Sequence, residues 1–164
     1  MIENSFFYHL GSVESSDSHS RFFDSFFIGS TFGKGYFLGW NTNYSAKGAK
    51  VGAETIALTG YEMGPKFGKL LNKTQTLSIA VVLNPLVRST ATLSNGAIES
   101  WSGLGAQGEI TYAPQVGKST WFGIKIIFDY VIFNQKTDSG NTTSTMNAPS
   151  PSIMPTLYLG WRFI

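Results

Sequence analysis

The residue types best suited to nucleophilic catalysis occur together near the N-terminus. Asp17, His19 and Ser20 supply the acid, base and nucleophile of a hydrolase triad. Neighbours in a short loop seldom reach the nucleophile–base–orienter geometry that this chemistry needs. The other histidine, His9, is predicted to lie on a strand. The sequence therefore predicts no catalytic residues, and we expect the protein not to be an enzyme.

Metal and cofactor chemistry is not indicated either. The chain has no cysteine, two histidines, and no acidic cluster with the spacing of a calcium-binding loop. Its glycines form no phosphate-binding pattern before a helix. Gly33-Lys34-Gly35 is instead typical of a hairpin turn. We expect no metal site and no cofactor.

Six charged residues stand out because they lie well inside segments of alternating apolar pattern. They are Glu62, Lys66, Glu109, Lys125, Asp129 and Arg162. Three are acidic and three are basic, so their charges sum to zero. They could form a polar pathway or gate, or a structural plug of ion pairs. Glu62 and Lys66 are four residues apart, about 13 Å along a strand at roughly 3.3 Å per residue, so each charge must pair across strands.

The elements that would position these charges are eight segments in which apolar residues recur at every second position. They are Asn4–Glu14, Arg21–Phe32, Tyr36–Ser45, Glu54–Gly68, Thr74–Val87, Ile98–Ala113, Ser119–Asn134 and Ile153–Ile164. No window approaches the roughly 20 apolar residues of a membrane helix. The segments are long enough for membrane-crossing strands, which need about nine to eleven residues. The sequence predicts a single all-β domain over residues 1–164, an eight-stranded antiparallel up-and-down barrel.

The predicted connectors alternate in length. Residues 15–20, 46–53, 88–97 and 135–152 form the long ones, and residues 33–35, 69–73 and 114–118 the short ones. An up-and-down order places all the long connectors at one end. Outer-membrane barrels have this asymmetry, with short periplasmic turns and longer extracellular loops.

The composition of the two faces indicates which one points outward. Only 13% of residues are charged, against about 25% in an ordinary soluble domain. The polar face consists mostly of Gly, Ser, Thr, Ala and Asn with balanced charges, which suits a narrow interior. The apolar face carries aromatic residues near its ends, as a membrane barrel requires. These are Tyr36, Trp40, Tyr44, Tyr112, Phe122, Trp161 and Phe163. We therefore expect the apolar face to point outward; a soluble lipocalin-like binder with the opposite orientation is the alternative.

The last segment, Leu157-Tyr-Leu-Gly-Trp-Arg-Phe-Ile164, is similar to the C-terminal assembly signal of outer-membrane barrels in Tyr158, Trp161, Phe163 and Ile164. It departs from that signal by ending on Ile164 instead of an aromatic residue. The whole chain resembles, in pattern, the small eight-stranded barrels of the OmpA and OmpX type from Gram-negative bacteria. The resemblance implies an outer-membrane location, a removed signal peptide, and contact with the assembly machinery. It also implies a side-chain-filled lumen and a structural or interaction role through the extracellular loops.

The sequence also leaves two other functions open. A narrow porin-like pore or conduit for small solutes is the first. A lipid-modifying enzyme is less favoured, because the late segments lack the histidine that such barrels carry. The sequence leaves the oligomeric state open.

Basic residues near the long-connector end suggest lipid contact. Arg21, Lys47, Lys50, Arg88 and Lys136 could bind lipopolysaccharide phosphates, since clustered cations attract anionic headgroups. Alternatively, these basic residues are ordinary solvated charges of loops. With a net charge of +2 and no basic run, the chain lacks the dense basic stripe of a nucleic-acid-binding protein, so no such partner is expected.

Overall fold

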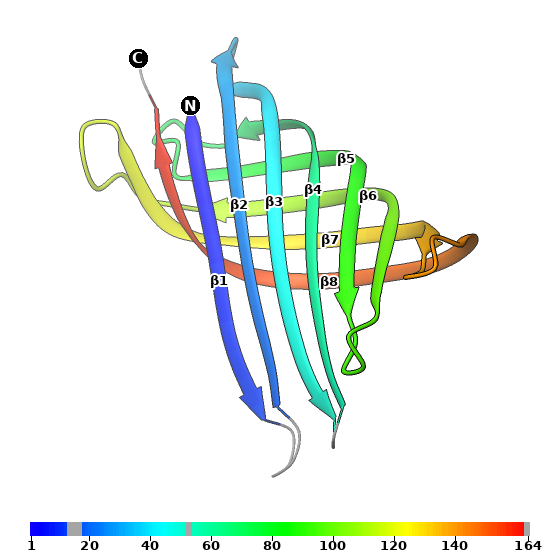
Figure 1. Ribbon diagram of the computed structural model, residues 1–164. Coiled ribbons are helices and arrows are strands. Elements are labelled where there is room, and N and C mark those ends of the chain that lie inside the picture. Colours follow the sequence, from blue (N-terminus) through cyan, green and yellow to red (C-terminus); the bar gives the residue numbers. More distant parts are fainter. Residues whose placement is uncertain (13–17, 52–53, 163–164) are drawn as a thin grey trace.

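A computed structural model describes residues 1–12, 18–51 and 54–162. The described residues form eight antiparallel strands in one sheet that closes on itself in the order of the sequence (Figure 1). The strands are β1 (Ile2–Ser12), β2 (Ser18–Phe32), β3 (Tyr36–Val51), β4 (Glu54–Leu70), β5 (Leu77–Thr92), β6 (Ile98–Tyr112), β7 (Thr120–Thr137) and β8 (Thr143–Trp161). The predicted all-β, up-and-down barrel is confirmed.

The period-two pattern separates an inner from an outer face. On β7, Lys125 and Asp129 point inward and are buried. Ile124 and Phe128, on the opposite side of the same strand, are 56% and 45% exposed. The other strands follow the same rule, since successive side chains of a strand point to opposite faces. The large apolar side chains of the outer face are thus exposed, while most of the charges on the strands lie inside.

The predicted difference in connector length is wrong for the described connectors. Residues 93–97 and 138–142 are no longer than residues 71–76 and 113–119 at the opposite end. The expected loop 135–152 is mostly strand, because residues 143–145 and 148–152 pair with β7. Its tight turn is held by the Asp138 carboxylate, which accepts hydrogen bonds from the backbone N–H groups of Gly140 (3.0 Å) and Thr142 (2.9 Å). Pairing with β7 here overrides the weak strand propensity of the segment.

The closure between β1 and β8 is short. The two strands pair over five residues each, from Ile2 opposite Trp161 to Phe6 opposite Leu157. β8 pairs with β7 along almost its whole length. The start of β1 and the end of β8 lie at the same end of the barrel, and β8 turns away from β1 beyond their contact (Figure 1).

Candidate functional site

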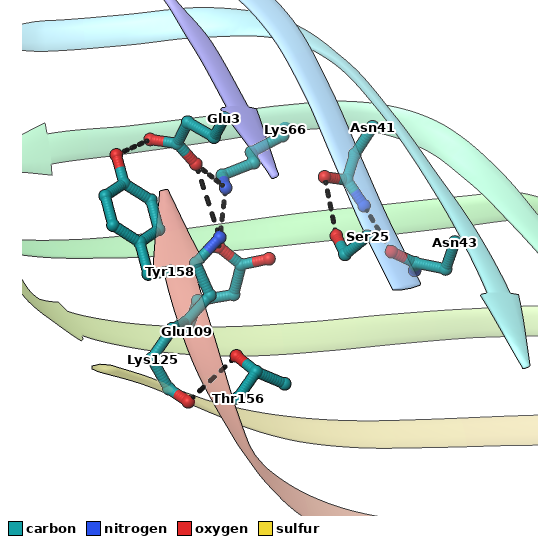
Figure 2. A network of polar contacts seen from close by, with 9 residues as sticks. All are labelled: Glu3, Ser25, Asn41, Asn43, Lys66, Glu109, Lys125, Thr156 and Tyr158. Carbon is teal, nitrogen blue, oxygen red and sulfur yellow. Dashed lines mark hydrogen bonds and ion pairs between the residues drawn. The ribbon is translucent and has the colours of Figure 1, made fainter. Parts of the chain in front are cut away.

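Four charged side chains from four strands meet inside the barrel and form the central feature of the site. Lys66 of β4 lies 2.7 Å from Glu3 of β1 and 2.6 Å from Glu109 of β6, measured between nitrogen and oxygen. Lys125 of β7 lies 3.3 Å from Glu3 and 3.2 Å from Glu109. We call these residues the charge quartet. Figure 2 shows both ammonium groups beside the Glu3 carboxylate, with Tyr158 reaching it from the other side.

The quartet is fully enclosed and electrically balanced. Its side chains are between 1% and 4% exposed. Two positive and two negative charges sum to zero, which offsets the high cost of removing single charges from water. The Tyr158 hydroxyl donates a hydrogen bond of 3.1 Å to the second oxygen of Glu3. The quartet therefore spans the lumen as a set of ion pairs.

Aromatic rings cover the two lysines. Lys66 lies 4.7 Å from the ring centroid of Phe27, and Lys125 lies 5.1 Å from that of Tyr158. Such contacts stabilise a desolvated cation. Gly39 provides room for the Phe27 ring, because a Cβ at that position would lie 2.7 Å from a ring carbon. The glycines of the polar face thus admit large inward rings into a narrow barrel.

Glu3 is the member of the quartet that the sequence analysis missed. Its segment was predicted to begin at Asn4, and a residue at the chain end gives little periodic signal. The ring closure places Glu3 opposite Gly160 of β8, so it shares an interior level with side chains of the C-terminal strand. The sequence did contain a signal for Glu3. Residues i and i+2 of a strand share a face, so the Glu3 carboxylate lies on the same face as Ser5.

Glu62 and Asp129 form a second polar cluster, in which their partners are neutral side chains. Glu62 accepts hydrogen bonds from Asn84 (2.8 Å) and Gln107 (3.1 Å). Asp129 accepts from Gln107 (3.2 Å) and Ser152 (3.4 Å). The structure therefore brings Lys66, Glu109 and Lys125 together, and it places Glu62 and Asp129 in a separate network bridged by one amide.

Arg162 belongs to neither cluster. Its guanidinium donates to the backbone oxygen and side-chain oxygen of Gln75 at 2.9 and 3.0 Å. Its centre lies 4.5 Å from the ring centroid of Trp121. Gln75 lies in the connector between β4 and β5, so Arg162 ties β8 to the end of the barrel that holds the chain termini.

The five basic residues proposed for lipid contact have different environments. Arg21 and Lys47 stand opposite each other in the β2–β3 ladder, on the inward side of their strands, and their charges act on Asp129. Arg88 is exposed on the outer face of β5. Lys136 forms a 2.7 Å ion pair with Glu99. The side chain of Lys50 lies outside the described residues.

Other predicted positions are only partly described. Tyr158 is buried in the lumen and Trp161 is half-buried at the end of β8. Phe163, Ile164 and Asp17 lie outside the described residues, as do the side chains of His9 and His19. Among the side chains that the structure describes, no group of three or more metal-ligating residues is found.

Comparisons with known proteins give no family for this chain. No protein-family model and no curated protein matches it. Within the described residues there is no helix long and apolar enough to cross a membrane.

Proposed function

We propose that the protein is an integral β-barrel of a bacterial outer membrane, of the OmpA and OmpX type. Its role is structural or interactive, exercised through the barrel end opposite the chain termini. The observation that carries the proposal is the apolar outer face. We call this face the apolar belt; it comprises the exposed aromatic and aliphatic side chains of all eight strands.

The dimensions of the apolar belt support a membrane location. On β7 the outward side chains from Phe122 to Ile132 are aliphatic or aromatic over eleven residues. On β3 the corresponding stretch runs from Tyr36 to Tyr44, nine residues, with one threonine. A strand needs about nine to eleven residues to cross the membrane. A water-soluble protein rarely exposes a continuous apolar surface of more than a few hundred square ångströms.

A polar contact between β1 and β2 lies within the apolar belt. Asp24 of β2 lies on the outer face and accepts a 2.8 Å hydrogen bond from the side-chain amide of Asn4. A charged group facing lipid is costly, and the cost falls toward the membrane surface. The hydrogen bond offsets part of that cost, so this pair is compatible with a membrane barrel.

The interior favours a closed barrel over a pore. Eight strands leave an interior that side chains can fill. In this protein the charge quartet joins β1, β4, β6 and β7 across the lumen, and Phe27 and Phe37 pack beside it. An ion crossing this level would have to separate ion pairs that are 2.6 to 3.3 Å long. We therefore propose that the barrel serves as a membrane anchor. It presents to partners the end opposite the chain termini, where β7 and β8 extend beyond the apolar belt.

Reconstitution tests both parts of the proposal. The purified protein is refolded into phosphatidylcholine vesicles, and insertion is measured by protection from protease and by heat-dependent migration in gels. Insertion is expected; a chain that folds and stays in solution without detergent would refute the membrane location. Inserted barrels are then placed in a planar bilayer. A silent bilayer is expected. Steady conductance steps that change size in Glu109→Gln would favour the pore instead.

A further inference from the structure

The hydrogen-bonded ladder between β1 and β8 ends partway along both strands. Phe6 opposite Leu157 is the last pair, although β1 continues to Ser12 and β8 reaches back to Thr143. In the described part of the chain, this stretch of β8 pairs with β7 alone. An open sheet edge in a membrane wall needs a physical explanation, because unpaired backbone groups are costly in lipid.

Prolines on β8 explain where the ladder stops. The N–H of Arg162 donates to the oxygen of Ser119 beside β7. Because backbone groups alternate in direction along a strand, the N–H positions of odd-numbered residues of β8 face β1. This part of the strand has prolines at three odd positions, Pro149, Pro151 and Pro155, and none of them can donate. The register places Pro155 opposite Tyr8, at the first hydrogen-bonding position beyond the paired segment.

An apolar groove of about 320 Å³ lies where the two strands separate. Its lining includes Phe6, Phe7, Tyr8, Ile124, Pro155 and Leu157. Phe7 points inward and packs against a buried cluster of Phe23, Ile127 and Met154. Phe7 therefore links the lining of the groove to this buried cluster, and the groove is backed by apolar side chains of the interior.

The outer rim of the groove is part of the apolar belt. Phe6, Ile124 and Leu157 are 43%, 56% and 44% exposed on the outer face. Under the proposed membrane location, on which this inference rests, the recess opens toward the acyl chains of the bilayer.

We propose that this groove binds one acyl or alkyl chain of a membrane lipid. A peptide strand is a poor occupant, because strand addition relies on main-chain hydrogen bonds and the β8 edge lacks donors at its prolines. A polar ligand is also a poor occupant, since an apolar recess would leave its hydrogen bonds unmade. A hydrocarbon chain needs only apolar contact, and the bilayer supplies it at the rim.

Photo-crosslinking in vesicles tests the proposal. The protein is inserted into phosphatidylcholine vesicles that contain a phosphatidylcholine with a diazirine near the end of one acyl chain. After irradiation, adducts are mapped by peptide mass spectrometry. We expect about tenfold more adducts at Tyr8 and Leu157 than at Val81 and Leu104, which are exposed on the outer face away from the groove. Such a ratio corresponds to a preference of about 1.4 kcal/mol for the groove.

Two variants connect the enrichment to the groove. Pro155→Val restores a donor toward Tyr8 and allows the ladder to extend, so the enrichment should disappear. Leu157→Trp fills the recess and leaves the ladder unchanged, with the same expected loss. Ile126→Val is the matched control, because Ile126 lies opposite Pro155 on β7 and outside the groove lining; it should keep the enrichment.

The outcomes separate this inference from the proposed function. Uniform labelling of an inserted, folded barrel would overturn the groove and leave the membrane location intact. Enrichment that survives in both groove variants would also overturn it. A chain that does not insert into vesicles would overturn the membrane location, and the groove proposal with it.

Discussion

Removing one carboxylate from the charge quartet tests whether its balance holds the barrel together. Glu109→Gln keeps the side-chain volume but leaves Lys66 and Lys125 to share Glu3. In the unmodified protein, Glu109 lies 2.6 Å from Lys66 and 3.2 Å from Lys125, and these side chains are 1% exposed. Breaking a buried pair by removing one partner costs about 3–5 kcal/mol, because a buried charge is left uncompensated. We expect that loss in the free energy of unfolding.

A second substitution distinguishes charge balance from packing. In the double variant Glu109→Gln, Lys125→Met, the interior is neutral again, and Lys66 keeps its 2.7 Å ion pair with Glu3. The double variant should therefore be more stable than the single variant. If packing or hydrogen bonding at Glu109 were the cause, the second change would add a further loss.

Unfolding in urea, followed by tryptophan fluorescence in detergent micelles, measures these differences. Glu99→Gln is the matched control, because Glu99 forms an ion pair of similar length, 2.7 Å, with Lys136 in a more exposed setting. Exposed pairs contribute about 0–1 kcal/mol. The reasoning fails if Glu109→Gln is as mild as the control, or if the double variant is less stable than the single one.

Two further substitutions test the contacts around the quartet. Tyr158→Phe removes the hydroxyl that donates to Glu3 at 3.1 Å, and should cost about 1.5–3 kcal/mol in the same unfolding assay; an unchanged stability would mean that this bond is not needed. Gly39→Ala should cost about 1–3 kcal/mol, because its Cβ would collide with the backbone oxygen of Ile28. Gly108→Ala, where a Cβ meets no atom within 4 Å, should be nearly neutral, and equal losses in both glycine variants would contradict the steric argument.

The strands and the inward direction of the central charges were predictable from the sequence. Alternation is a local property, so it can be read over any stretch of six or more residues. Lys66, Glu109 and Lys125 lie within long alternating segments, and their inward direction follows from their neighbours. The distances between them depend on which strands face each other across the barrel, and that information is not local.

Most of the differences between the predicted and the observed structure arise where strands end. Lys47 was assigned to a loop because β3 was expected to stop at Ser45, whereas the strand continues to Val51 and its alternation turns Lys47 inward. The ladder between β2 and β3 extends the strand through a segment of low strand propensity. Glu62 was expected to pair with a cation, and its actual partners are amides, a choice that only the packed interior determines.

The charge quartet and the short closure of the barrel lie at the same level, and each explains the other. Glu3 stands opposite Gly160 within the five paired residues of β1 and β8. β1 pairs with β2 over eleven residues but with β8 over only five, and a slip of one residue would turn the inward face of β1 toward the outside. Such a slip would expose the Glu3 carboxylate and leave the charges of Lys66 and Lys125 unbalanced. Buried ion pairs add little stability compared with a well-packed apolar core, and fixing a register is their best-attested role. The ion pairs of Glu3 therefore act together with the long β1–β2 ladder to hold β1 in register where its ladder with β8 is short.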